Sequence, residues 1–327
     1  MRAAVCHEYG PPEVVRVGEH PSPELGAGQV RVRVGAAAVN FPDVLLIANL
    51  YQVSVPTPFV PGSEYAGEVV EVADDVATLA VGDRVTGGGL VGAFAEEAVV
   101  AAAHARVVPS GVSDADAAAF GVAHRTAWHA LRSFGHLRSG DQLVVLGAGG
   151  GVGLAAVQLG THLGAVVTAV ASSPEKLAAA KACGAVNLID HRSDDVRAAL
   201  QELVPDGADV VIDPVGGDLS EVALRRVRWG GRFVVIGFAS GTIPAIPLNL
   251  VLLKGVQVVG FQLRDLGLHL PDEMARNDTE LDGLLAAGEI VPHIGARLPL
   301  DRVAEALRLV GDGQAVGKVV IDVAAPA

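Results

Sequence analysis

Hydrophobic and polar residues alternate in short segments along the first third of the chain. The sequence Val-Arg-Val-Arg-Val at residues 30–34 alternates strictly, which predicts a strand with one buried face. Glycine and proline residues separate this segment from others of similar length, and further strands are expected at residues 67–72, 83–85 and 95–100. Several short strands divided by turn residues indicate a β-rich domain that is partly barrel-like.

A different pattern begins after residue 112. Ser113 and Asp116 predict a capping box at the start of an alanine-rich helix, and a second helical segment is expected at residues 126–134. Apolar segments of strand length then alternate with helical segments. Strands are expected at residues 142–146, 166–170, 186–189, 209–213, 232–237 and 256–260, and helices at residues 154–163, 174–183, 194–203 and 219–227. This alternation predicts an α/β fold with a six-stranded, doubly wound parallel sheet of the Rossmann type.

The end of the chain is expected to return to the first domain. Helices at residues 272–287 and 301–310 and a strand at residues 318–323 follow the sixth strand, when the parallel sheet is already complete. We therefore expect one domain of residues 1–121 and 264–327, and a second domain of residues 122–263.

A cluster of glycines follows the first strand of the expected parallel sheet and leads directly into a helix. The turn consists of Ala148, Gly149, Gly150, Gly151, Val152 and Gly153. The order strand, tight turn and helix N-terminus is typical of a dinucleotide-binding site, because side chains in the turn would hold a pyrophosphate away from the backbone N–H groups. Alanine stands at position 148, where this pattern most often has its first glycine.

The residues after the second strand of this sheet bear on the choice of cofactor. An NAD-selective site carries an acidic residue there, which binds the ribose 2′-hydroxyl and would repel a 2′-phosphate. Here the sequence is Ala-Ser-Ser-Pro, and the first acid is Glu175. The missing acid favours NADPH, with Ser172, Lys176 and Arg192 as candidate partners of the 2′-phosphate. The alternatives are that Ser173 only caps a helix and that Arg192 is a surface charge.

Composition narrows the classes of partner. With 327 residues, of which 50% are hydrophobic, the chain can form two domains with substantial cores. A net charge of −13 and the lack of a long basic run argue against nucleic acid or an anionic membrane as the main partner. Cys6 and Cys183 predict no disulfide framework and fit a reducing compartment. Residues 1–8 do not resemble a signal peptide, and the uncharged residues 142–174 are interpreted as a buried strand–helix–strand unit, so we expect a cytoplasmic protein.

The order of these parts is similar to that of the medium-chain dehydrogenase/reductase superfamily. More narrowly, the chain resembles the zinc-independent NADPH:quinone oxidoreductase (zeta-crystallin-like) family. The segments that carry the resemblance are residues 38–43, 61–67, 82–85, 149–153 and 317–320. The resemblance implies a catalytic, GroES-like domain with a partly open β-barrel, and an NADP-binding Rossmann domain.

Zinc-dependent members of this superfamily hold a catalytic zinc ion with a cysteine and a histidine. The corresponding residues here are Asn40 and Ser63, and the four closely spaced cysteines of the structural zinc site are missing. His124 and His129 are expected to point in different directions on a helix. We therefore expect no metal ion.

The absence of a Lewis acid would favour activated substrates over simple ketones. Hydride addition to a quinone or an α,β-unsaturated carbonyl places negative charge on a conjugated oxygen, for which ordinary hydrogen-bond donors suffice. The resemblance implies Asn40 and Tyr51 as these donors, with Asp43 and Thr126 as nearby positioning residues and Tyr51 as the candidate proton donor. The alternatives are structural: Asn40 as a turn residue, Tyr51 as a half-buried aromatic residue and Asp43 as a helix cap.

Four further residues are candidates for cofactor binding: Gly237, Phe238, Phe261 and Lys318. Both phenylalanines follow strand ends, where they would flank the nicotinamide ring or pack in the core. Lys318 belongs to the Gly-Lys-Val-Val segment through which the tail resembles the family.

Two other functions remain open at this stage. One is reduction of a carbon–carbon double bond in an enone, an acrylate or an acyl-CoA ester, although the acidic composition disfavours a CoA ester. The other is a structural or sensor protein that binds NADPH without turnover. The uncharged last strand, residues 256–260, lies at a sheet edge that needs covering. Together with the resemblance, this edge predicts a homodimer.

Overall fold

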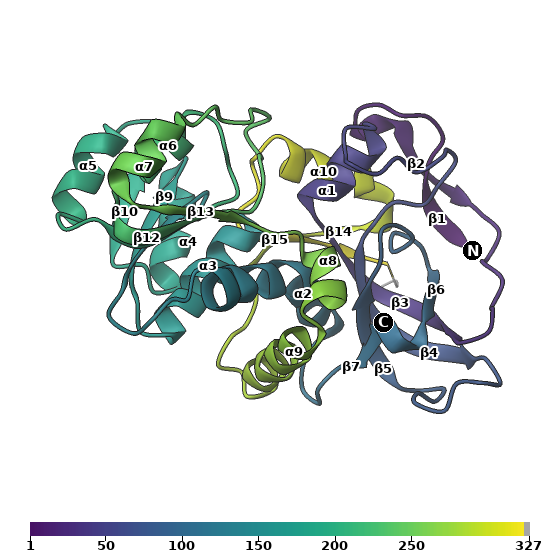
Figure 1. Cartoon of the computed structure of the whole chain (residues 1–327). Coiled ribbons are helices and arrows are strands. Elements are labelled where there is room, and N and C mark those ends of the chain that lie inside the picture. Colours follow the sequence, from purple (N-terminus) through teal and green to yellow (C-terminus); the bar gives the residue numbers. More distant parts are fainter. Residues whose placement is uncertain (324–327) are drawn as a thin grey trace. The chain divides into compact units, whose positions relative to one another are not determined.

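The computed structural model describes residues 1–323 of the chain, which divide into two compact units (Figure 1). The first unit comprises Met1–Val122 and the chain from Val291 onward, and the second comprises Ala123–Ile290.

The second unit is built on a parallel sheet of six strands. These are β8 (Gln142–Leu146), β9 (Val166–Ala171), β10 (Asn187–Asp190), β11 (Ala208–Asp213), β12 (Val227–Val235) and β13 (Gln257–Gly260). Their order in the sheet is β10-β9-β8-β11-β12-β13, and every neighbouring pair is parallel. The direction of winding changes between β8 and β11, which is where doubly wound sheets bind ligands. The predicted Rossmann-type sheet is therefore confirmed.

Helices follow the strands of this sheet. They are α3 (Gly151–His162), α4 (Pro174–Ala182), α5 (Val196–Leu203), α6 (Asp218–Leu224), α7 (Leu248–Lys254), α8 (Leu263–His269) and α9 (Pro271–Ala286). A core of apolar residues from the strands and helices includes Val144, Leu146, Ile189 and Phe233, all nearly inaccessible to water. Because the central strands are covered on both faces, their sequences are almost continuously apolar.

The first unit contains a larger sheet with mixed strand directions. Its strands are β3 (Gln29–Val39), β4 (Glu64–Val72), β5 (Arg84–Gly88), β6 (Glu97–Ala101), β7 (Ala105–Val107), β14 (Ile294–Pro299) and β15 (Lys318–Asp322). The order is β14-β15-β3-β4-β5-β7, and β6 also pairs with β3. Strands β1 (Arg2–Cys6) and β2 (Val15–Glu19) form a separate antiparallel pair. This arrangement confirms the β-rich part of the predicted fold.

Three α-helices and several short helical turns complete the chain. They are α1 (Phe41–Ile47), α2 (Asp114–His129) and α10 (Val303–Gly311), the 3-10 turns Pro12–Val14, Ala102–His104 and Leu300–Arg302, and a π-helical turn at Ala130–Phe134. Ser113 accepts a hydrogen bond from the backbone N–H of Asp116 at 3.1 Å and donates one to its carboxylate at 2.6 Å, as the predicted capping box requires.

Two sequence expectations differ from the structure. The helix expected at residues 219–227 ends at Leu224, because Val227 is already the first residue of β12. Helices α8 and α9 lie in the second unit, so the chain enters the first unit at Val291 and not at residue 264. The predicted boundary assumed that a finished sheet ends a domain, whereas α9 contacts α2 through the ion pair of Arg125 with Asp278.

The pairing of β15 with β3 determines what lies at one end of the first unit. The two strands run antiparallel, with Val319 opposite Val39. Lys318 is therefore brought beside the C-terminal end of β3, where Asn40 begins α1. Among residues 1–323, no helix is long and apolar enough to cross a membrane.

The packing of α3 against β8 generates a first prediction. A Cβ atom added to Gly153 would lie 2.1 Å from the carbonyl oxygen of Gly147, whereas one added to Gly150 would meet no atom closer than 3.6 Å. We expect Gly153→Ala to lower the free energy of unfolding by at least about 2 kcal/mol, because the turn or the helix must move. Gly150→Ser, at a helix N-cap, should leave it nearly unchanged.

Urea unfolding of both variants followed by circular dichroism measures the difference. Equal stability of Gly153→Ala and the wild type would contradict the close approach of α3 to the turn.

Candidate functional site

The glycine turn is the first part of the candidate site. Gly147 has φ +60°, a left-handed conformation that favours glycine, and Gly150 is the N-cap of α3. The helix begins at Gly151, three residues earlier than expected, so Gly151, Val152 and Gly153 form its first turn. The N–H groups of that turn have no partners within the helix and face the carboxyl end of β8, which makes a site for an anion. Gly147 was missed because the predicted turn began at Ala148.

Ala148 and Gly149 have different roles in this turn. Ala148 is fully buried, and its N–H donates to the carbonyl oxygen of Val170 at 3.0 Å. A Cβ on Gly149 would lie 2.3 Å from the Cβ of Lys176. The absence of a side chain at Gly149 therefore allows the aliphatic stem of Lys176 to lie across the turn.

Basic groups gather at the carboxyl ends of β9 and β10. The Lys176 ammonium group donates to Ser172 Oγ at 3.1 Å. Burial, and secondarily the positive charge of Arg192, lowers the pKa of Lys176. Burial and the same guanidinium also lower the pKa of the His191 side chain. The backbone N–H of His191 donates to the carbonyl oxygen of Ala171 at 3.0 Å. The structure thus places Lys176 beside Ser172, and Arg192 is close enough to affect the pKa of both Lys176 and His191.

Sequence reasoning missed His191 because it considered only fixed positive charges, although the residue directly precedes Arg192. Ser173 is the N-cap of α4 and accepts the N–H of Lys176 at 3.3 Å. The structural interpretation of Ser173 is therefore confirmed.

The remaining candidate residues of the second unit differ from one another in exposure and in their contacts. Phe238 is 36% exposed in the loop after β12, next to Gly237, whose N–H donates to the carbonyl oxygen of Asp213. Phe261 stacks on Phe134, with ring centroids 4.5 Å apart and planes 6° from parallel. One face of the Phe261 ring is therefore already occupied. Thr126 is buried on α2.

Asp213, at the end of β11, is a residue that the sequence analysis did not single out. Its carboxylate accepts the N–H groups of Val215 at 2.8 Å and Gly216 at 2.9 Å, and the hydroxyl of Ser220 at 2.5 Å. The side chain of Val215 lies 2.7 Å from where a Cβ on Gly147 would be. Asp213 thereby holds the loop after β11 against the glycine turn. The sequence does contain a signal for Asp213, because this acidic residue ends an apolar strand and directly precedes Pro-Val-Gly-Gly.

A second group of candidate residues lies within the first unit, around the start of α1. Asn40 is the N-cap residue, and its backbone N–H donates to Asp43 Oδ2 at 2.7 Å. Asp43 is fully buried. Asp43 is thus not the N-cap itself, and its carboxylate completes the capping box from the N3 position with one of its two oxygens.

A buried ion pair lies beside Asn40. The ammonium group of Lys318 donates to Glu64 Oε1 at 2.5 Å, to Asn40 Oδ1 at 2.7 Å and to the carbonyl oxygen of Val39 at 3.3 Å. Glu64 Oε2 accepts the N–H of Val122 at 2.7 Å. Lys318 and Glu64 are 4% and 2% exposed, so each charge depends on the other.

These contacts bear on the predicted role of Lys318. All three of its N–H donors are directed at oxygen atoms of the first unit, so a direct bond to a cofactor would require the loss of one of them. Sequence reasoning did not select Glu64, although its place in the Gly-Ser-Glu triplet was visible.

The side-chain amide of Asn40 is fully hydrogen-bonded. A lysine can only donate, so Oδ1 must face Lys318 and Nδ2 must point the other way. Nδ2 donates to Ser63 Oγ at 3.1 Å and to Glu64 Oε1 at 2.9 Å. Both N–H bonds of the amide therefore have partners within the first unit.

Asp43 has an unusual acidity for a carboxyl group. Burial raises its pKa to about 7, against the lowering effects of the Asn40 N–H, the Ser63 hydroxyl and the Lys318 charge. The charge of Glu64 adds to the rise. Asp43 therefore holds a proton more readily than an exposed carboxyl group does.

Tyr51 lies in the loop after α1 and is half-buried. Its hydroxyl makes no hydrogen bond to another of residues 1–323, so it is available to a ligand. The structure brings Asn40, Asp43 and Lys318 together in the first unit, while Thr126 and the glycine turn belong to the second.

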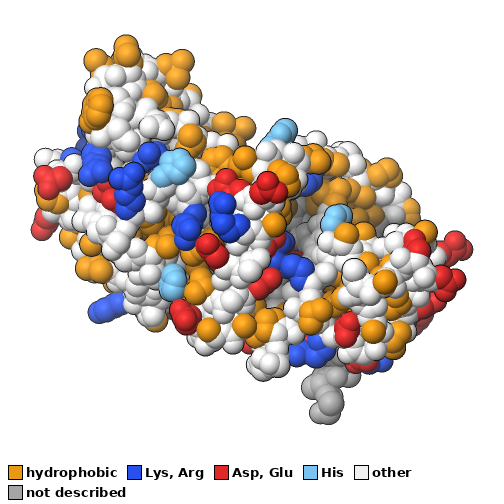
Figure 2. All heavy atoms as spheres, turned by 60° about the horizontal axis from the view of Figure 1, so that its bottom comes forward, with side chains coloured by type: hydrophobic (Ala, Val, Ile, Leu, Met, Phe, Trp, Pro, Cys, Tyr) orange, Lys and Arg blue, Asp and Glu red, His pale blue; other side chains and the backbone are white. Residues whose placement is uncertain are grey.

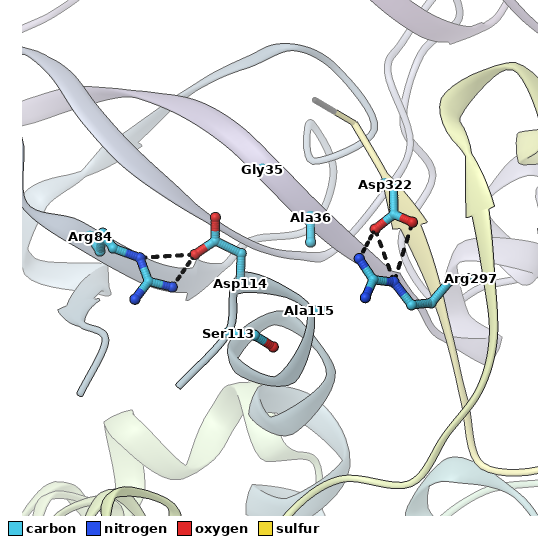
Figure 3. Close-up of a pocket in the computed structure, with 8 residues that line it drawn as sticks. All are labelled: Gly35, Ala36, Arg84, Ser113, Asp114, Ala115, Arg297 and Asp322. Carbon is cyan, nitrogen blue, oxygen red and sulfur yellow. Dashed lines mark hydrogen bonds and ion pairs between the residues drawn. The ribbon is translucent and has the colours of Figure 1, made fainter. Parts of the chain in front are cut away.

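A separate pocket of about 390 Å³ in the first unit contains none of the candidate residues (Figure 3). Two ion pairs line it, in which Arg84 Nε lies 3.1 Å from Asp114 and Arg297 Nη2 lies 2.7 Å from Asp322. Each guanidinium is thus already neutralised by a carboxylate. In the part of the chain that the structure describes, no group of three or more His, Cys, Asp or Glu residues could hold a metal ion.

Two sequence families match the chain. The alcohol dehydrogenase GroES-like domain matches residues 26–110, and the zinc-binding dehydrogenase domain matches residues 151–277. Each match lies within one of the two structural units.

Similar proteins extend over nearly the whole chain. The quinone oxidoreductase-like protein 2 homolog of Nematostella vectensis is 36% identical over 324 residues, which cover 98% of this chain and 88% of that protein. A mycobacterial protein solved in complex with NADPH has a TM-score of 0.91 and 30% identity, over 99% of this chain and 100% of that one. The Escherichia coli quinone oxidoreductase complexed with NADPH has a TM-score of 0.91 and 26% identity over the same shares.

The buried ion pair generates a second prediction. Lys318→Met leaves the Glu64 carboxylate buried without a counter-charge, and we expect it to lower the free energy of unfolding by about 3–5 kcal/mol. The double variant Lys318→Met with Glu64→Gln removes both charges and should be less destabilised than the sum of the two single variants.

A double-mutant cycle in urea measures the coupling, which we expect to be at least about 1 kcal/mol. Additive losses would show that the two charges do not depend on each other.

Proposed function

Because the chain belongs to the medium-chain dehydrogenase/reductase superfamily, in its quinone oxidoreductase-like family, we propose that it transfers hydride from NADPH to a quinone or another α,β-unsaturated carbonyl. Family membership makes it an oxidoreductase. The observation that carries the proposal is the glycine turn with Lys176 lying across it, because this one arrangement combines an anion-binding helix N-terminus with a positive charge next to it.

The surroundings of Ser172 support NADPH as the cofactor. A 2′-phosphate carries negative charge, and Lys176, Arg192 and the half-buried His191 supply donors at the ends of β9 and β10. Two of the similar structures are complexes with NADPH. When bound, NADPH supplies the hydride, and the residues of the second unit hold it by its phosphates.

The residues around Asn40 support a reaction that does not use zinc. The positions of two zinc ligands in relatives hold Asn40 and Ser63, and the neighbouring Glu64 is paired with Lys318. Two neutral side chains and a compensated carboxylate are a poor set of ligands for a zinc ion. Hydrogen-bond donors alone can stabilise the conjugated oxyanion that forms in a quinone or an enone.

The partner is accordingly a small molecule. On the face shown in Figure 2, basic side chains lie among acidic and hydrophobic ones and do not form one continuous basic surface. We place the protein in the cytoplasm, and its two unpaired cysteines support this location.

A panel of acceptors, assayed in parallel with NADPH and NADH, tests the function. We expect quinones to be reduced, at a higher kcat/KM with NADPH than with NADH. Turnover with acrylates or enoyl esters but not with quinones would favour the C=C reductase. Tight NADPH binding without reduction of any acceptor would indicate a structural or sensor protein.

Lys176 provides a third prediction, about the cofactor. Lys176→Met keeps the aliphatic stem over Gly149 and removes the charge. We expect the KM for NADPH to rise about tenfold or more, since a hydrogen bond to a charged group contributes about 1.5–3 kcal/mol. The KM for NADH should change little, because NADH has no 2′-phosphate.

Lys181→Met on the same helix is the control and should affect neither cofactor, because Lys181 is exposed at the far end of α4. An equal rise in the KM for both cofactors would contradict a role in 2′-phosphate binding.

We also propose that the protein is a homodimer formed along β13. This strand is at the edge of the parallel sheet. Large apolar side chains near it are exposed: Trp229, Leu248, Leu252 and Leu253 are each more than three-quarters exposed, and Val258 is 44% exposed. Exposed apolar side chains next to an open strand edge are costly in water, and a second copy would cover them.

Val258→Lys tests this proposal as a fourth prediction. A lysine in the middle of β13 would be buried next to its symmetry mate, so we expect the molar mass from light scattering to fall to that of a monomer. Val186→Lys, at an exposed position before the opposite edge strand, should leave a dimer. A wild-type protein that is monomeric at all concentrations would overturn the proposal.

A further inference from the structure

The hydrogen bonds of Asn40 raise the question of which group faces the substrate. Its two amide N–H bonds are directed at Ser63 and Glu64, and its oxygen accepts from Lys318. To donate to a substrate oxygen, Asn40 would have to give up its bond to the Ser63 hydroxyl or its bond to the buried Glu64 carboxylate, and the loss of the second bond costs about 1–3 kcal/mol. Asn40 is therefore better suited to holding its neighbours than to binding the substrate.

Ser63 is the neighbour with an available proton. It is half-buried, whereas Asn40, Asp43 and Glu64 are each at least 92% buried. Its Oγ accepts from Asn40 Nδ2, and a hydroxyl that accepts one hydrogen bond can still donate its own proton and accept a second. The Asn40 amide thus fixes the Ser63 oxygen without using its hydrogen.

The backbone before Ser63 restricts its position further. Gly62 has φ +101°, and a Cβ there would lie 2.5 Å from the ring of the buried Phe94. The ring of Phe94 and the glycine conformation therefore fix the path by which the chain reaches Ser63.

Asp43 is fully buried, whereas Ser63 is half-buried. Its Oδ2 is held by the Asn40 N–H, whereas its Oδ1 is buried without a hydrogen-bond partner among the described residues. The Ser63 hydroxyl is nevertheless close enough to lower the pKa of this carboxyl group. Hydrogen bonds of catalytic groups are often long in a free enzyme and shorten when substrate binds.

We propose that Ser63 delivers the proton to the reduced substrate and that Asp43 resupplies it. The inference rests on the proposed function, because it concerns the proton that must follow the hydride. Asn40, Glu64 and Lys318 act as positioning residues that hold the Ser63 oxygen.

The proposed step balances as follows for a quinone. The hydride from NADPH brings two electrons and one hydrogen, which leaves a hydroquinone anion and NADP⁺. The Ser63 O–H bond breaks, and its proton forms the new O–H bond of the hydroquinone. The Ser63 oxygen takes the proton of the Asp43 carboxyl group, and the carboxylate that results is reprotonated from solvent through the half-buried Ser63 hydroxyl before the next turnover.

The charge state of Asp43 controls the direction of the Ser63 hydrogen. A protonated Asp43 donates to the Ser63 oxygen and leaves the serine proton free for the substrate. An ionised Asp43 would instead accept the serine proton. The other charged groups at this place are Glu64 on β4, which favours the protonated form, and Lys318 on β15, which favours the ionised form. The active form is the protonated one, so kcat should fall as the pH rises above about 7.

Ser63→Ala tests the inference as a fifth prediction. We expect kcat with a quinone to fall by about 100-fold or more, the scale of general acid catalysis, while the Kd for NADPH is unchanged. Ser63→Thr keeps a hydroxyl and should retain most of the activity. A solvent isotope effect on kcat in D2O should persist in Ser63→Thr, because its hydroxyl still transfers a proton, and the decline above pH 7 should disappear in Asp43→Asn.

Titration of the Asp43 carboxyl carbon by ¹³C NMR gives a readout that does not depend on turnover. Ser63→Ala should raise the pKa of Asp43, because the hydroxyl that lowers it is gone. This result, with the kinetic loss, supports the relay. A Ser63→Ala variant that keeps its kcat while Tyr51→Phe loses activity would overturn the inference and make Tyr51 the donor.

These results are distinct from a failure of the proposed function. If the wild type reduces quinones and Ser63→Ala does so equally well, only the inference is wrong. If the wild type reduces no acceptor, the proposed function is wrong and the inference is overturned with it.

Discussion

The buried ion pair of Lys318 and Glu64 is the interaction on which the first unit depends. Neither charge could remain where it is without the other, because each has lost nearly all contact with water. The pair links β15 to β4 across the intervening β3, and its remaining hydrogen bonds extend to the end of β3 and to α2. The position of Asn40, and through it that of Ser63, follows from the location of these two charges.

Much of the fold could be predicted from the sequence, because the second unit obeys simple rules. Its strands are apolar on both faces and its helices begin after turn residues, so the alternation of the two was readable and the strand order follows from the doubly wound class. The first unit was harder. Strands β1, β2 and β14 are short. Four of the five residues of β1 are buried, whereas most residues of β2 and β14 are exposed or half-buried, so none of the three shows a clear alternation of apolar and polar residues.

The candidate site could be predicted in part for a related reason. Backbone requirements leave a trace in the sequence, as at Gly153, where only glycine fits. Contacts between side chains that are far apart in the sequence leave no such trace. Nothing in the sequence near Lys318 indicates that its ammonium group forms an ion pair with Glu64. The hydrogen bonds of the Asn40 side-chain amide depend on this ion pair. Asn40 was predicted to donate a hydrogen bond to the substrate, whereas in the structure its amide N–H bonds are directed at Ser63 and Glu64.

The pairing of β15 with β3 has a consequence for how the chain folds during synthesis. Strands β14 and β15 leave the ribosome only after the whole second unit, whose residues are contiguous and whose contacts are mostly between neighbouring segments. The second unit can thus fold while the first still lacks two strands and the counter-charge of Glu64. The chain completes its earliest-made sheet last, with a strand that contributes a lysine to the candidate site.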